Sequence, residues 1–135
     1  MKLKLIILGI LLSLISCERE ESNNLNQQIL GKWELTSTRQ LKNETWTNVQ
    51  ISNSKFEFNK SEIIVNGNTF LDNSGKYPYT ISKKNYFDNN ISEPKSDLLE
   101  FNNKRYVIEF GTNNSKQVLT LMNYSDGKIY FRLER

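Results

Sequence analysis

Residues 29–38 read Ile-Leu-Gly-Lys-Trp-Glu-Leu-Thr-Ser-Thr, and they form the first stretch of the chain with the pattern of a β-strand. Gly31 permits the change of backbone direction with which such a strand begins. Trp33 and Leu35 then point to one face and their polar neighbours to the other, because successive side chains of a strand alternate. We therefore expect the first strand of a β-domain here, with Trp33 in its core.

The rest of the chain repeats this alternation in short segments. Turn signals separate them, among them Asn66-Gly67 and Asp126-Gly127, which suit two-residue hairpin turns. Short strands joined by local turns predict an all-β antiparallel up-and-down meander. Closure removes the unpaired edges, so we expect an approximately eight-stranded β-barrel, with a two-sheet sandwich as the alternative. The alternating segments are residues 45–51, 56–58, 63–65, 77–81, 105–110, 118–122 and 129–134.

The N-terminal segment has the features of an export signal. Lys2 and Lys4 precede an apolar run, residues 5–15, that is shorter than the ~20 residues of a membrane-spanning helix. A basic start followed by such a run is typical of a secretory signal peptide, which we assign to residues 1–16.

Leu14-Ile15-Ser16-Cys17 follows directly and resembles the bacterial lipobox. The resemblance implies diacylglyceryl attachment to the Cys17 thiol, cleavage before Cys17 and acylation of the new amino group. Several acyl chains on one residue give stable membrane anchoring. Cys17 is also the only cysteine, so no intramolecular disulfide competes for it.

The residues after the cysteine indicate a tether and a location. Glu18-Arg19-Glu20-Glu21 resembles the acidic stretch that sends lipoproteins of the Bacteroidota to the outer face of the outer membrane. A charged, solvated tether is the alternative, so we expect an outer-membrane anchor with the periplasmic or cell-surface face left open. Residues 22–28 are polar and lack aromatic side chains, and we predict that residues 17–28 form a flexible tether.

Charge and composition exclude several classes of function. Loss of Lys2 and Lys4 with the signal leaves sixteen basic and fifteen acidic side chains, without a basic stripe, which argues against nucleic-acid binding. The chain has no histidine, and its one cysteine is expected to be a thioether. We therefore predict no enzymatic activity, no catalytic residue, no metal site and no cofactor.

Gly31-Lys32-Trp33 matches the Gly-x-Trp signature that opens the first strand of lipocalins. With the lipobox, the tether and the strand-rich body, residues 29–135 resemble the lipocalin-like domains of small lipoproteins of the Bacteroidota. In that family the tryptophan closes the base of the barrel and an arginine from the last strand packs across it. The resemblance implies that Trp33 and Arg132 form this pair. Because Arg132 alternates with the apolar residues of its strand, three alternatives stay open: the inner face is the one that carries Tyr130 and Arg132, the partner is Arg135, or there is no partner.

Two functional hypotheses follow. The first is non-covalent binding of a small hydrophobic or amphipathic ligand in the barrel mouth, since tyrosines can offer an apolar ring with a polar tip. The second is a protein-interaction or inhibitor module with a filled barrel, whose long loop, residues 82–95, binds another envelope protein. Plain core packing is the alternative for the aromatic residues. The ligand-binding candidates are Tyr77, Tyr79, Tyr106, Phe110 and Tyr130.

Overall fold

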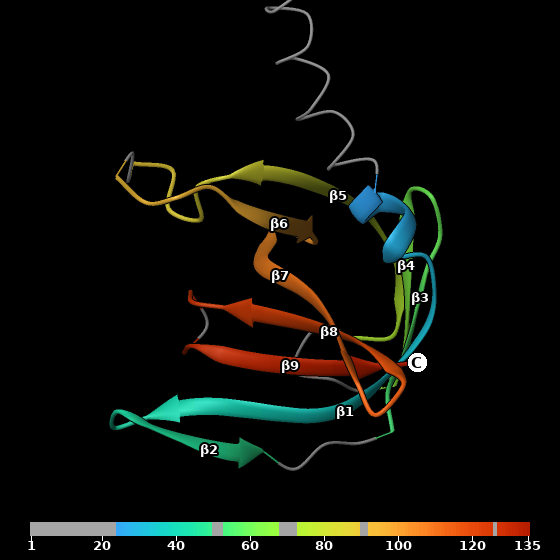
Figure 1. The fold of residues 1–135 in the computed structure, drawn as a ribbon, viewed down its shortest axis with the longest axis horizontal. Helices are drawn as coiled ribbons and strands as arrows, with labels where there is room; N and C mark the ends of the chain where they lie inside the picture. Colours follow the sequence, from blue (N-terminus) through green and yellow to red (C-terminus); the bar gives the residue numbers. More distant parts are fainter. Residues whose placement is uncertain (1–23, 50–52, 68–72, 90–91, 126) are drawn as a thin grey trace, which may run out of the picture.

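The computed structural model describes residues 24–49, 53–67, 73–89, 92–125 and 127–135. It consists of nine antiparallel strands and one short helix, residues 24–28 (Figure 1). The strands are β1 (Gly31–Lys42), β2 (Thr45–Val49), β3 (Lys55–Phe58), β4 (Glu62–Asn66), β5 (Gly75–Lys84), β6 (Ser96–Phe101), β7 (Lys104–Asn113), β8 (Lys116–Asn123) and β9 (Ile129–Glu134).

Eight of the strands close into a barrel. Strands β3 to β9 pair with their sequence neighbours, and β1 pairs with β3 on one edge and with β9 on the other. The predicted closed, eight-stranded up-and-down barrel is therefore confirmed, and the sandwich is excluded. Strand β2 is additional: it pairs with the second half of β1, from Thr38 to Lys42, beyond the part that pairs with β3.

The first strand can serve three neighbours because it is twelve residues long and bulged. The register with β9 shifts between Leu35 and Ser37, so two β1 residues oppose one residue of β9 at that point. The bulge lies where β1 passes from the β3 partner to the β2 partner. Trp33 and Leu35, before the bulge, are both buried as the alternation predicted.

The turns differ in part from the sequence prediction. The two-residue turn predicted at Asn66-Gly67 is wrong: Val65 pairs with Gly75, so the connection from β4 to β5 runs over residues 67–74. Asp126 lies outside the described residues, and the Asp126-Gly127 turn stays a prediction. The β1–β2 turn has positive φ at Asn43 and Glu44.

The barrel interior is filled by one cluster of sixteen buried residues. Tyr106 is 1% exposed; its ring stacks on Phe101 at 5.4 Å and meets Phe131 edge-on at 6.3 Å. Burial of each such aromatic side chain stabilises the fold by about 1.5–3 kcal/mol.

Figure 1 shows two distinct ends of the barrel. The β1–β2, β5–β6 and β8–β9 connections lie on the left of the view, and the start of β1, the short β3 and β4 strands and the C-terminus lie on the right. The β5–β6 connection is shorter than predicted, because Ser82 to Lys84 belong to β5. We call residues 85–95 the strap, of which 85–89 and 92–95 are described.

Candidate functional site

The base of the barrel is closed by Trp33 and Arg135. The indole is 1% exposed, and its Nε1 donates a hydrogen bond of 2.7 Å to the carbonyl of Ile29. The guanidinium carbon of Arg135 lies 4.2 Å from the ring centroid. Its Nη2 donates to the carbonyl of Gln28 at 2.8 Å, and its Nη1 donates to that of Leu30. Partial burial lowers the pKa of Arg135.

The implied pairing of Arg132 with Trp33 is corrected by this geometry. Arg132 follows buried Phe131 and precedes buried Leu133, so its side chain points out of the barrel. There its Nε lies 2.9 Å from Oε1 of Glu134. The partner of Trp33 is the alternative residue, Arg135, which directly follows the last strand and lies over the indole ring.

The same arginine explains why residues 24–28 are helical where the composition predicted a flexible tether. The guanidinium contacts the carbonyl of Gln28, the last helical residue, and a cation stabilises the carbonyl end of a helix. Ile29, directly after the helix, is fully buried and fixes the segment to the core.

The five ligand-binding candidates do not converge on one cavity. Tyr106 is part of the core, and Tyr79 is 9% exposed with its hydroxyl donating to Asn59 at 2.6 Å. Burial raises the pKa of Tyr79. The hydroxyl of Tyr77 donates to the backbone of Asn73, and its ring packs against Phe101.

The other two candidates lie elsewhere. Tyr130 precedes buried Phe131 and occupies the outer face. Phe110 lies near the base, where its ring centroid is 6.4 Å from that of Trp33. There a hollow of about 270 Å³ is lined by Gln28, Trp33, Phe110, Gly111, Thr112, Gln117 and Arg135.

The strap covers the outer face of the sheet formed by β6, β7 and β8. Leu98 and Leu99 are consecutive in β6 and both fully buried, so both faces of this strand are covered. Leu99 belongs to the barrel core, whereas Leu98 points outward in the same row as Val107 and Met122. The Tyr86 side chain lies over this outer row, with Val107 and Met122 in the lining of the same hollow.

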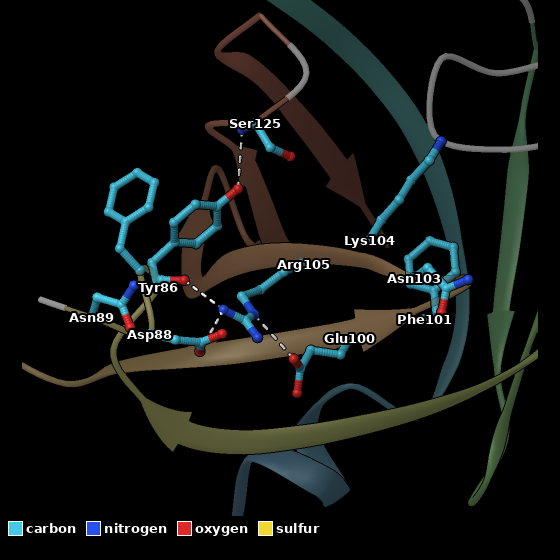
Figure 2. A pocket seen from close by; sticks show the side chains of 10 residues that line it. Tyr86, Asp88, Asn89, Glu100, Phe101, Asn103, Lys104, Arg105 and Ser125 are labelled. Atoms are coloured by element: carbon cyan, nitrogen blue, oxygen red, sulfur yellow. Dashed lines mark hydrogen bonds and ion pairs between the residues drawn. The ribbon is translucent and has the colours of Figure 1, made fainter.

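Tyr86 attaches the strap to the β8–β9 turn. It is 8% exposed, and its hydroxyl accepts backbone N–H groups of Tyr124 at 3.0 Å and Ser125 at 3.1 Å. The hydroxyl also donates to Oδ1 of Asn123 at 3.3 Å. Strap and β8–β9 turn are thus joined by one buried side chain (Figure 2).

Arg105 of β7 binds two residues of the strap. Its Nη1 donates to the carbonyl of Tyr86 at 2.6 Å and to Oδ1 of Asp88 at 2.9 Å, while its Nε donates to Glu100 at 3.0 Å (Figure 2). Hydrogen bonding to Asp88 and Glu100 outweighs partial desolvation and raises the pKa of Arg105.

Glu100 completes this charged group. Its Oε2 lies 2.7 Å from Nζ of Lys84. Burial alone raises the pKa of Glu100, but the hydrogen bonds from Lys84 and Arg105 outweigh burial and hold it below its usual range. The charges under the strap are therefore balanced among themselves.

Two aromatic side chains flank Tyr86 and are exposed. Phe87 is 51% exposed and Tyr124 40%, although both are large and apolar. Their rings meet that of Tyr86 edge-on, with centroids 4.8 Å and 5.1 Å away. We call Tyr86, Phe87 and Tyr124 the aromatic ridge.

A hollow lies on each side of Tyr86 and Phe87. Figure 2 shows the larger one, of about 720 Å³, between the strap and the β6–β7 turn. The smaller one, of about 440 Å³, lies over β7 and β8. The larger hollow is lined by Tyr86, Phe87, Asp88, Asn89, Glu100, Phe101, Asn103, Lys104, Arg105 and Ser125. The smaller is lined by Tyr86, Phe87, Glu93, Pro94, Ser96, Val107, Glu109, Met122 and Tyr124.

The ridge was not singled out from the sequence, although the loop that carries most of it was. Tyr86 and Phe87 are consecutive aromatics inside an otherwise polar stretch, and this was the available signal. Tyr124 had none, because its contact with Tyr86 depends on the position of the β8–β9 turn.

In the described ranges, no three His, Cys, Asp or Glu side chains are grouped so as to hold a metal ion. Nor does the described part of the chain contain a helix that is long and apolar enough to cross a membrane. No family model matches the chain, and no curated protein or solved structure shows significant similarity to it.

Proposed function

We propose that this chain is a lipid-anchored protein of the outer membrane that recognises an envelope protein through the aromatic ridge, with the filled barrel as its scaffold. The observation that carries the proposal is the pair of exposed rings, Phe87 and Tyr124, held against the buried Tyr86. No bond is made or broken in this function, and it requires no cofactor.

Exposed aromatic side chains are suited to binding a protein. Aromatic side chains and arginine are enriched in the energetically dominant parts of protein interfaces. A ring that is already fixed loses little conformational entropy on binding. Hydrogen bonds hold the hydroxyl and the backbone carbonyl of Tyr86, so the central ring of the ridge is fixed, and the two exposed rings pack edge-on against it.

The membrane anchor is supported by the lipobox. Cys17 lies outside the described residues, and the expected acylation comes from the match of residues 14–17 to that motif. Residues 24–28 are helical and tied to Arg135, so the tether would run from Cys17 to residue 23. A tether of this length would hold the base of the barrel near the membrane.

A second function, the binding of a small hydrophobic or amphipathic ligand, is favoured by the hollow at the base. Its lining combines Phe110, one of the five candidates, with Trp33 and the cation of Arg135. Its volume of about 270 Å³ is slightly below the ~300–1,000 Å³ of typical ligand pockets. The ridge is the better-supported site because its exposed rings already flank larger hollows.

Native mass spectrometry of the full chain, purified gently in detergent from its own host, tests both functions. We expect a complex with a second protein that is lost in Phe87→Ala and retained in Trp46→Ala. Trp46 is a matched control, since it is 46% exposed and lies on β2. A bound small molecule lost in Phe110→Ala would instead support the second function. A bare chain, or a complex that Phe87→Ala leaves intact, would contradict recognition through the ridge. The same spectrum reports the acyl mass on Cys17.

A further inference from the structure

The two hollows beside the ridge differ in charge. The larger contains Lys104 and Arg105 as well as Asp88 and Glu100, and the last three are joined by ion pairs. The smaller contains two carboxylates and neither lysine nor arginine in its lining. The smaller hollow is therefore an acidic site, whereas the larger is electrically balanced.

The two carboxylates of the smaller hollow are Glu93, on the strap, and Glu109, on β7. Within the ranges that the structure describes, neither forms an ion pair. An incoming cation would not have to displace an internal partner from them. Both carboxylates are accessible to solvent, so a cation would pay little for desolvation on reaching them.

Between the carboxylates the floor is apolar. Val107 and Met122 are direct partners in the register of β7 and β8, and both point to the outer face. Phe87 and Tyr124 form the adjoining walls, and the Tyr124 hydroxyl lies 3.8 Å from Sδ of Met122. Methionine adapts its shape to a bound apolar group because its side chain is unbranched and polarisable.

We infer that the smaller hollow is the specificity site of the ridge, and that it takes an apolar side chain of the partner protein flanked by lysine or arginine. The inference rests on the proposed function and adds the chemistry of the partner segment. The apolar side chain would lie on Val107 and Met122 against the ridge. The flanking cations would meet Glu93 and Glu109, and the open ring faces would attract them as well.

Methyl NMR gives a direct test, because Met122 is the only methionine in residues 17–135, which remain after the expected cleavage before Cys17. The full chain, ¹³C-methyl-labelled at methionine and held in detergent, is titrated with the peptide acetyl-Gly-Lys-Leu-Lys-Gly-amide. Met122→Leu identifies the Met122 signal. We expect this signal to shift in a saturable way. Two related peptides are controls: one with Glu in place of both Lys, and one with Gly in place of Leu. The first should bind at least five-fold more weakly, and the second should leave Met122 unshifted.

Neutralising single carboxylates locates the effect. Glu93→Gln and Glu109→Gln are each expected to weaken binding about two- to five-fold, as for exposed ion pairs. Glu57→Gln, which removes the same charge from β3, should leave the affinity unchanged. Equal binding of the Lys and Glu peptides, or an unshifted Met122 signal with the Lys peptide, would overturn the inference. A partner complex that still depended on Phe87 would then leave the proposed function standing.

Discussion

The guanidinium carbon of Arg135 lies 4.2 Å from the ring centroid of Trp33, and the same guanidinium donates hydrogen bonds to the carbonyls of Gln28, the last helical residue, and Leu30, just before β1. One residue at the C-terminal end of the described chain thus holds together the first strand and the segment before it. The base of the barrel is closed by this contact.

Arg135→Ala is expected to destabilise the protein by about 1–3 kcal/mol, because it removes a cation over a buried ring together with hydrogen bonds to backbone carbonyls. Urea unfolding followed by tryptophan fluorescence measures the effect. Arg132→Ala is the control and should cost about 0–1 kcal/mol, since it removes only an outer-face ion pair with Glu134. Equal losses in the two variants would contradict the assignment of Arg135 to Trp33.

Tyr106 and Tyr130 should respond differently to truncation, although both were candidates for ligand binding. Tyr106→Ala is expected to cost about 3–5 kcal/mol, because it leaves a cavity in the core. Tyr130→Ala should cost about 1 kcal/mol or less, as is usual for a partly exposed position. The free energies of unfolding of the two variants, measured in urea, test this difference. A larger loss in Tyr130→Ala would show that the faces of β9 are assigned the wrong way round.

Arg105→Ala should release the strap while the barrel stays folded. The variant loses the bonds to the Tyr86 carbonyl and to Asp88, and hydrogen exchange of the amides of residues 85–89 is expected to rise at least ten-fold. Arg39→Ala, on the outer part of β1, is the control and should leave these amides unchanged. Protection of the strap that persisted in Arg105→Ala would mean that Tyr86 alone secures it.

We expect Glu100 to make part of the free energy of unfolding sensitive to acid. Its pKa in the folded protein lies below the unfolded value of 4.5, so its contribution is complete above pH 4.5. The contribution is lost as the pH falls through the folded pKa, because the unfolded chain then binds the proton more readily. Glu100→Gln should therefore lose less stability than the original chain between pH 5 and pH 3. Identical pH profiles of the urea midpoint would refute this.

The sequence predicted the barrel because alternation and turn residues act locally. Trp33 and Leu35 are buried as the period-two pattern required, and the up-and-down order follows from short connections. The β1 bulge, strand β6, the position of β2 outside the closed barrel and the longer β4–β5 connection were not predicted. Each depends on which strand lies alongside, and a single segment carries no information on that.

The candidate site was predicted only as a region. Residues 82–95 were expected to be a loop that carries function, but the sequence did not show that Tyr86 folds back onto the outer face of the sheet. That position depends on Arg105 and on the backbone at Tyr124, which are 19 and 38 residues away. Because Phe87 packs against Tyr86, the same long-range contacts also place Phe87 in the ridge.

The central claim, recognition through the aromatic ridge, is tested most directly by photo-cross-linking in the living host. A photoreactive phenylalanine analogue is placed at position 87, and, in a separate variant, at position 46 on β2. The account predicts a discrete protein adduct from position 87 and none from position 46. An adduct of equal yield from both positions, or no adduct from position 87, would contradict it.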